Sequence, residues 1–235
     1  MKKLFLAMAI LAASVTSSFA ESFDNSFGVR IFGGFGSGYS TLETSEGDEY
    51  MTMDSKPQIG LSLDSRWYVA KGNVLGLAIN ARWLDFAYNK SYFDKVGKFD
   101  VSKLDIETNE FSIEALNAGV IGTIAFNEHW AIDVYYDLGA SALIKVFDYS
   151  DNLKKYGIDV DDDDNDKVDN YFFGLNHKVG AALHVGFFQV GCEAKLGHLK
   201  FQKWGLSDEA KDAYDKDNAP KAKVGCARVF IGFLF

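Results

Sequence analysis

The acidic segment 159–169 (DVDDDDNDKVD) contains the residues best suited to metal chemistry. Calcium prefers oxygen ligands, and a loop can gather several carboxylates around one ion. An EF-hand loop needs glycine at its sixth position and glutamate at its twelfth, where this segment has Asp164 and Asn170. The segment is therefore either a solvated, self-repelling loop or a calcium site of another kind. The candidate ligands of such a site are Asp159, Asp161, Asp163 and Asp166.

The overall composition limits which partners and which fold classes are expected. The formal net charge is -9, which argues against nucleic acid, because phosphate binding needs a concentrated basic face. Cys192 and Cys226 are the only cysteines, too few for a disulfide scaffold, and they form no CxxC pair. Abundant glycine and aromatic residues with only 2 prolines favour many regular strands joined by turns.

Residues 1–20 have the three-part pattern of a secretory signal peptide. Lys2 and Lys3 precede an apolar run, and the segment closes on small residues at Ala20. The apolar run is shorter than the roughly 20 residues that a membrane-spanning helix needs. No cysteine follows it, so a lipid anchor is not expected. We predict cleavage before Glu21 and one folded domain over residues 21–235.

Apolar and polar residues alternate along the rest of the chain. Successive side chains of a strand point to opposite faces, so this period indicates strands with one apolar and one polar face. In 58–69, for example, Leu61 and Leu63 alternate with Ser62 and Asp64. The segment 111–126 is apolar on both faces in part and is assigned from its neighbours. The predicted strands are 27–35, 58–69, 74–84, 111–126, 130–140, 173–185, 188–196 and 224–235.

Long and short breaks between these strands alternate strictly. The long, polar breaks lie near 40–57, 88–109, 147–168 and 202–220, and the short ones near 70–73, 127–129 and 186–187. Short helices are expected inside two long breaks, at 150–157 and 207–216. Outer-membrane barrels have this asymmetry, with long external loops, short periplasmic turns and an even number of strands. The sequence predicts an all-β fold, an eight-stranded antiparallel up-and-down transmembrane β-barrel.

Both signs of charge occur on the polar faces of the predicted strands. Eight tilted strands enclose an interior just wide enough for side chains, and buried charges persist there only when paired and hydrogen-bonded. We expect ion pairs to plug the lumen instead of leaving an open pore. The predicted inward residues are Arg30, Asp64, Arg66, Arg82, Asp133, Asp137, Lys178, Glu193, Lys195 and Arg228.

The signal segment, the eight alternating strands and the terminal sequence VFIGFLF resemble the small outer-membrane barrels of the outer-membrane protein A and X type. The resemblance implies the outer membrane of a Gram-negative bacterium, with outer-membrane lipids, lipopolysaccharide and the barrel-assembly machinery as partners. It implies no cofactor, and no peptidoglycan-binding domain is expected after the last strand. By the same resemblance, the assembly signal comprises Val229, Ile231, Phe233 and Phe235.

The cysteines and histidines complete the reactive residues. Alternation places Cys192 toward lipid and Cys226 inward, so two free thiols are the first expectation and a cross-strand disulfide the second. Outer-membrane lipid deacylases resemble this fold and use a His-x-Ser pair, which none of the four histidines forms. His177 and His198 are expected near the outer rim. A non-enzymatic structural or surface role is favoured, with a narrow passive channel and a lipid-modifying enzyme as alternatives.

Overall fold

The computed structural model describes residues 23–35, 41–43, 49–96, 98–104, 107–148, 167–203 and 219–235. The predicted signal peptide, the four candidate calcium ligands and both predicted loop helices lie outside these ranges. The described elements are β1 (Ser26–Phe35), β2 (Thr41–Glu43), β3 (Glu49–Ser55), β4 (Gln58–Lys71), β5 (Leu75–Val96), β6 (Phe99–Asp100), the 3-10 helix η1 (Ser102–Leu104), β7 (Glu107–Ala125), β8 (Trp130–Asp148), β9 (Lys167–Val185), β10 (Phe188–Gln202) and β11 (Lys221–Leu234).

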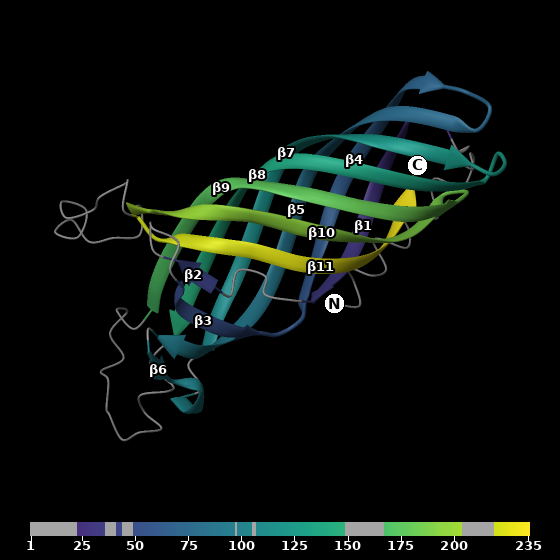
Figure 1. Cartoon of the computed structure of the whole chain (residues 1–235). Coiled ribbons are helices and arrows are strands. Elements are labelled where there is room, and N and C mark those ends of the chain that lie inside the picture. The colour runs from purple at the N-terminus through teal and green to yellow at the C-terminus, as the bar shows by residue number, and fades with distance from the viewer. Residues whose placement is uncertain are drawn as a thin grey trace.

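Eight of these strands close into a ring, which confirms the predicted fold class. The order around the ring is β1, β4, β5, β7, β8, β9, β10 and β11, and every neighbouring pair is antiparallel (Figure 1). β1 and β11 form the closing seam, where Phe27 and Phe235 exchange backbone hydrogen bonds of 2.9 and 2.8 Å. Closure leaves the ring no unpaired strand edge.

The short connections gather at one end of the barrel. They link β4 to β5, β7 to β8 and β9 to β10. In the second, the side-chain Oδ1 of Asn127 accepts hydrogen bonds from the backbone N–H groups of His129 and Trp130, at 2.8 and 2.9 Å. In the third, Gly186 adopts the positive φ of 57° that a two-residue hairpin turn needs. Local turn chemistry therefore fixes this end.

At the other end the strands run further than the sequence predicted. The break expected near 88–109 is wrong, because β5 continues to Val96 and pairs with β7 up to Tyr92 opposite Glu107. The break near 40–57 contains β2 and β3, which lie between β11 and β5. In these extensions the outward face carries polar residues, for example Lys90 beside Glu107, while the inward face mixes polar and apolar residues, for example Ser91 and Phe93. An apolar–polar rule therefore misses these extensions.

Two extra residues reverse the side-chain alternation within the barrel. Opposite β4, the pairing steps from Leu84 to Arg82 and leaves Trp83 as the extra residue of a β-bulge. In the adjacent β7, the pairing with β8 skips two residues between Ala115 and Ala118, and Leu116 has a φ of 57°. Beyond each bulge, toward the long connections, the inward positions change from one parity to the other. This reversal explains why 111–126 looked apolar on both faces.

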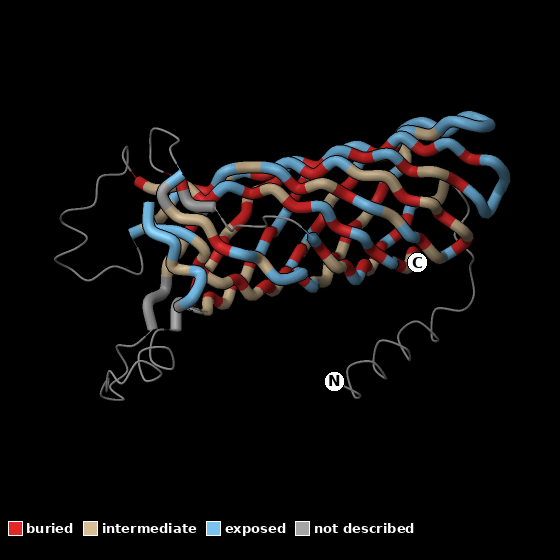
Figure 2. Tube along the Cα trace, turned by 60° about the horizontal axis from the view of Figure 1, so that its bottom comes forward, coloured by how far each residue is buried: buried red, intermediate tan, exposed pale blue. Residues whose placement is uncertain are grey.

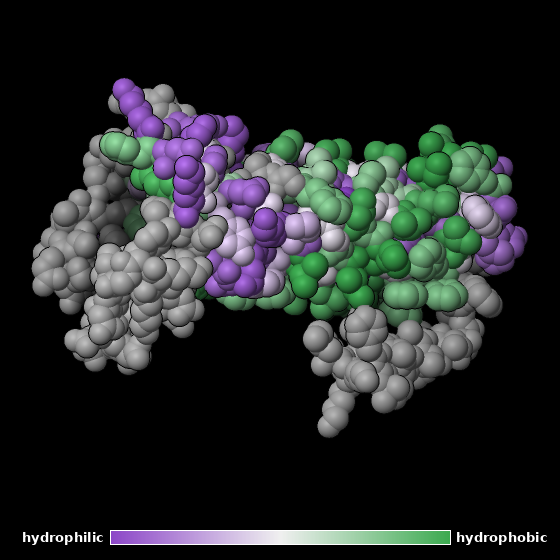
Figure 3. All heavy atoms as spheres, turned by 90° about the horizontal axis from the view of Figure 1, so that it is seen from below, coloured by the Kyte–Doolittle hydropathy of each residue, from purple (hydrophilic) through white to green (hydrophobic). Residues whose placement is uncertain are grey.

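The outer surface of the barrel is apolar around its circumference. Figure 2 shows buried and exposed residues alternating along the strands, and Figure 3 shows hydrophobic residues along the barrel body giving way to hydrophilic ones toward one end. Ile59, Ile79, Val134 and Ile231 are each about half exposed on this surface. We call this surface the apolar belt. Among the described residues, no helix is long and apolar enough to cross a membrane.

Because of the bulge in β7, glycine at position 116 is expected to be more stabilising than alanine, which is the reverse of the order in a regular strand. At Leu116, the φ of 57° costs a residue with a Cβ about 1–2 kcal/mol. Leu116→Gly is therefore expected to be more stable than Leu116→Ala by about 1 kcal/mol. At the regular strand position Val120, the order should reverse, with glycine less stable than alanine by about 0.5–1 kcal/mol. Urea unfolding in lipid vesicles measures both pairs, and the same order at both positions contradicts the prediction.

The charged lumen as candidate functional site

The inside of the barrel holds equal numbers of buried cations and carboxylates. Considering only described residues whose exposure is at most 5%, there are seven of each. The cations are Arg30, Arg66, Arg82, Lys145, Lys178, Lys195 and Arg228, and the carboxylates are Asp64, Asp85, Glu110, Glu114, Asp133, Asp137 and Glu193. Burying a charge is costly unless it is paired and hydrogen-bonded. Equal numbers of cations and carboxylates are therefore needed if charged side chains are to fill the lumen.

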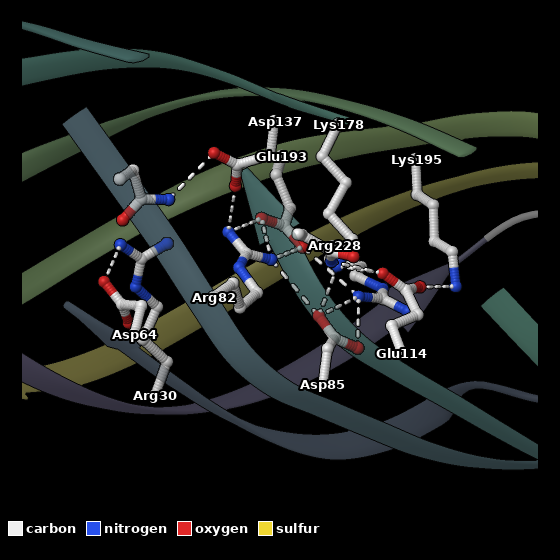
Figure 4. A network of polar contacts seen from close by, with 12 residues as sticks. Arg30, Asp64, Arg82, Asp85, Glu114, Asp137, Lys178, Glu193, Lys195 and Arg228 are labelled. Carbon is white, nitrogen blue, oxygen red and sulfur yellow. Dashed lines mark hydrogen bonds and ion pairs between the residues drawn. The ribbon is translucent and has the colours of Figure 1, made fainter. Parts of the chain in front are cut away.

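Asp85 on β5 is the centre of the network. Its carboxylate accepts contacts from Lys178 Nζ at 2.7 Å, Arg228 Nη1 at 3.0 Å and Arg82 Nη1 at 3.2 Å (Figure 4). These cations come from β9, β11 and β5, so one carboxylate links strands on different sides of the ring. Glu193 on β10 accepts from Arg82 at 3.1 Å and Arg228 at 3.2 Å. The two carboxylates share the two arginines and form one unit.

Glu114 on β7 extends the unit toward the long connections. It pairs with Lys178 Nζ at 2.5 Å and with Lys195, and it accepts a hydrogen bond of 2.7 Å from Asn117 Nδ2. Glu114 and Asn117 both point inward because the bulge at Leu116 lies between them. The bulge therefore supplies two inward polar residues where regular alternation would supply one.

Simpler pairs lie on the side of the short turns. Arg66 Nη1 contacts Asp133 at 2.7 Å, and Thr123 Oγ1 donates to the same carboxylate at 2.6 Å. Arg30 Nη2 contacts Asp64 at 2.9 Å. Each guanidinium thus has its own carboxylate.

Guanidinium groups of both the central unit and the simpler pairs also lie over aromatic rings. Arg228 Cζ is 4.2 Å from the ring centre of Phe32, and Arg30 Cζ is 4.9 Å from that of Phe230. Desolvated cation–π contacts of this kind stabilise by about 2 kcal/mol. Aromatic faces and carboxylates therefore share the interior of the barrel.

An apolar cluster fills the lumen near the long connections. Its buried members come from β3, β5, β8, β9, β10 and β11, and they are Met53, Phe93, Leu143, Phe172, Leu199, Ala222 and Val224. Next to it, Lys145 Nζ pairs with Glu110 at 2.8 Å, and Ser91 Oγ donates to Glu110 at 2.8 Å. The barrel thus has a packed apolar core near the long connections. Its charged interior begins next to this core and continues toward the short turns.

The structure brings together all ten residues that the sequence placed in the lumen. Each is buried and has an oppositely charged partner within 3.2 Å. Sequence reasoning missed Asp85, Glu110, Glu114 and Lys145. Asp85, Glu110 and Lys145 lay outside the predicted strands, and the bulges hid the phase of Asp85 and Glu114. The consecutive apolar pair Trp83–Leu84, both facing outward, was the available signal for a phase change.

The remaining predicted residues lie on the outside or stand alone. Val229, Ile231, Phe233 and Phe235 all occupy the outward face of the last strand and its end, and their role in assembly stays a prediction. Both cysteines are free, with Cys192 facing outward and Cys226 inward, as the alternation predicted. Within the described ranges, no group of three or more potential ligands is arranged to hold a metal ion.

Three of the four histidines lie on the strands of the barrel, each in a different environment. His184 is buried in the lumen and contacts the carbonyl oxygen of Gly186. His198 Nε2 lies 3.4 Å from a carboxylate oxygen of Glu43. His177 was expected near the outer rim, but it lies outward on β9 within the apolar belt, 2.5 Å from the hydroxyl of Tyr136. This polar pair occupies a face that otherwise consists mainly of apolar side chains.

Comparison with known proteins gives structural likenesses only. No protein-family model matches the chain, and no curated protein sequence does. Similar solved structures include the attachment invasion locus protein Ail of Yersinia pestis, at 14% identity and a TM-score of 0.43, covering 90% of this chain and 97% of Ail. They also include the outer membrane protease OmpT of Escherichia coli (9%, TM-score 0.44, covering 94% and 100%) and the outer membrane protein OprG of Pseudomonas aeruginosa (12%, TM-score 0.41, covering 90% and 96%).

The chain's own geometry defines its class. A closed ring of eight antiparallel strands, apolar outside and charged inside, is the architecture of the small outer-membrane β-barrels. Short turns at one end of the ring and longer connections at the other complete that architecture.

Removing the central carboxylate is expected to destabilise the barrel severely. Asp85→Ala leaves one excess positive charge buried among Lys178, Arg82 and Arg228, which must then share the remaining carboxylates, so the free energy of unfolding should fall by about 3–5 kcal/mol. Urea unfolding in lipid vesicles measures this loss. Pairing Asp85→Asn with Lys178→Met removes one charge of each sign and should recover part of it.

Asp54 provides the matched control for this loss. Its side chain is 76% exposed and lies 3.8 Å from Lys56, so Asp54→Ala should cost at most about 1 kcal/mol. Equal losses for Asp85→Ala and Asp54→Ala would show that the network does not hold the lumen together.

Proposed function

We propose that this protein is a non-enzymatic outer-membrane β-barrel with a structural or surface-interaction role and a lumen plugged by ion pairs. The observation that carries the proposal is the balanced set of seven buried cations and seven buried carboxylates inside a closed ring. These side chains contact one another across the lumen, and they occupy the interior that a passive channel would need. The plug therefore favours a stable scaffold over a conduit.

The long-connection end supports a role at the cell surface. The hairpin of β5 and β7 extends past the apolar belt and carries β6 and η1 at its tip. At this tip Phe99 is 76% exposed, and Lys95, Lys98 and Lys103 are exposed around it. Exposed aromatic and charged side chains at the tip of a hairpin suit contact with a partner at the surface. We assign this end to the cell exterior and the short turns to the periplasm.

The partners follow from the same placement. The apolar belt would contact outer-membrane lipids, with lipopolysaccharide in the outer leaflet. During biogenesis, the alternating apolar residues of the last strand would engage the barrel-assembly machinery, and Phe233 already packs against two aromatic neighbours, Phe187 and Phe188. Export through a cleaved signal peptide at residues 1–20 completes this proposal.

Membrane placement is tested by fractionation and heat-modifiable mobility. Because closed barrels resist detergent until they are heated, the unboiled protein should migrate differently from the boiled protein on a denaturing gel. It should also sediment with the outer-membrane fraction. A protein that stays in the soluble fraction, with the same mobility before and after boiling, would contradict placement in the outer membrane.

Conductance separates a plugged barrel from a narrow channel. The wild-type protein, inserted into a planar bilayer, is expected to give no steady open-channel current, because ion pairs and the apolar cluster fill the lumen. A protein-free bilayer and a bilayer with an open porin are the controls. Steady single-channel currents from the wild-type protein would favour the channel alternative and reject the plugged lumen.

A further inference from the structure

A hydrogen-bonded pair of polar side chains lies within the apolar belt, on the outward faces of β8 and β9. The hydroxyl of Tyr136 and Nδ1 of His177 are 2.5 Å apart, and the centres of the two rings are 5.9 Å apart. The two strands are neighbours in the barrel wall (Figure 1), and Tyr136 is 44% exposed on its outer surface. We call these two residues the Tyr–His pair.

Apolar side chains surround His177 on four sides. Leu138 on β8 and Leu196 on β10 stand opposite it in the two neighbouring strands. Leu175 and Val179 precede and follow it on the same outward face of β9. These four residues are between 40% and 58% exposed, so the imidazole faces hydrocarbon once the apolar belt is in a bilayer. Polar side chains at this depth are rare, and they mark functional contacts.

A single hydrogen bond leaves the Tyr–His pair half-satisfied whichever way the bond runs. If the Tyr136 hydroxyl donates to Nδ1, then Nε2–H of His177 remains as a donor and the hydroxyl oxygen as an acceptor. If Nδ1–H donates instead, Nε2 remains as the acceptor and the hydroxyl as the donor. Among the described residues, neither side chain has a second hydrogen-bond partner. Hydrocarbon supplies no water to satisfy these groups, so leaving them unpaired is costly.

A second copy of the same pair supplies both missing partners. Each pair offers one donor and one acceptor, so a two-fold axis lets each imidazole bond to the hydroxyl of the other copy. Because the two polar groups of a pair are in direct contact, they lie at nearly the same depth in the membrane. A two-fold axis along the membrane normal relates groups of equal depth. Hydrocarbon chains offer neither a donor nor an acceptor, so self-complementarity favours another copy of this chain over lipid.

A different polar pair on the outer surface lacks this property. Trp83 Nε1 donates to Ser65 Oγ at 2.8 Å, across β5 and β4. An indole has one donor and no acceptor, so this bond satisfies it. The serine hydroxyl can donate to a backbone carbonyl of its own strand. The Trp83–Ser65 pair therefore needs no external partner and provides a matched control.

We propose that the Tyr–His pair is the centre of an interface between two copies of this barrel in the membrane. The imidazole of each copy would bond to the Tyr136 hydroxyl of the other, and Leu138, Leu175 and Val179 would pack around these bonds. Polar contacts of this kind hold membrane-spanning segments together where apolar packing alone gives little preference over lipid. This inference rests on the proposed placement in the outer membrane and adds a partner to the proposed role.

The dissociation constant of the dimer tests the proposal. The folded full-length protein, in a neutral detergent matched in density to the solvent, is studied by sedimentation equilibrium, and the wild type should show a monomer–dimer equilibrium. Tyr136→Phe with His177→Leu should raise the dissociation constant by about fivefold to tenfold, because two hydrogen bonds across the interface are lost. This variant is more apolar than the wild type, so an interface held by apolar packing alone would be at least as tight.

Ser65→Ala with Trp83→Phe is the control for this measurement. It also removes a polar pair from the outer surface, but the pair is one that satisfies itself, so the dissociation constant should not change. A monomeric wild type would overturn the proposal. Equal dissociation constants for the wild type and the Tyr136 and His177 double variant would overturn it as well.

Cross-linking in isolated outer membranes locates the interface. In a background with Cys192→Ser, which removes the exposed native thiol, Leu138→Cys beside His177 should give a covalent dimer with a short, membrane-permeant bifunctional maleimide. Ile31→Cys is the control, because Ile31 is 43% exposed on β1, at the far side of the ring from β8 and β9. Cross-linking at position 31 that equals or exceeds cross-linking at position 138 would reject this interface.

Heat-modifiable mobility separates this inference from the proposed function. It shows that each variant is folded before its association is measured. A folded, membrane-inserted wild-type protein that sediments as a monomer would overturn the dimer and leave the proposed function intact. A protein that stays in the soluble fraction would instead contradict the placement in the outer membrane.

Discussion

The constraint on which the structure depends is that every backbone N–H and C=O inside hydrocarbon must be paired within the protein. The chain meets it by closing β1 against β11, where the last residue, Phe235, bonds to Phe27. Closure with eight strands leaves a narrow interior. Since one face of every strand must then point into that interior, the inward side chains have to pack and neutralise one another. The ion-pair network is thus a direct consequence of satisfying the backbone.

The two bulges connect backbone geometry to this network. Asp85 and Glu114 face inward because the alternation reverses at Trp83 and Leu116, in adjacent strands at the same level. Between them these two carboxylates contact Arg82, Lys178, Lys195 and Arg228. Without the reversal, four cations would have only the carboxylates of the regularly alternating positions. A local irregularity of the strands therefore balances the charge of the whole lumen.

Sequence reasoning predicted the closed ring, its short turns and the inward position of ten charged residues, because a lipid-facing strand must alternate. Ile59 and Asp64 illustrate this rule, which depends only on local pattern. The rule failed where a strand no longer has an apolar outer face, and where a bulge reverses the alternation. Beyond the belt, residues such as Lys90 and Glu107 face water and pair with each other, so the extensions looked like loops. A bulge such as that at Leu116 depends on the neighbouring strand, and within its own segment it showed only as an interrupted alternation.

The packed cluster around Phe172 and Leu199 affects which parts of the sequence can change during evolution. It lies where the ring projects beyond its lipid-facing surface, and there it holds the strand ends as the interior of a water-soluble domain would. The strand ends from which the connections leave are therefore held in place by packed side chains. The sequences of these connections can change in length and chemistry while the cluster, and the charges beneath it, keep their positions.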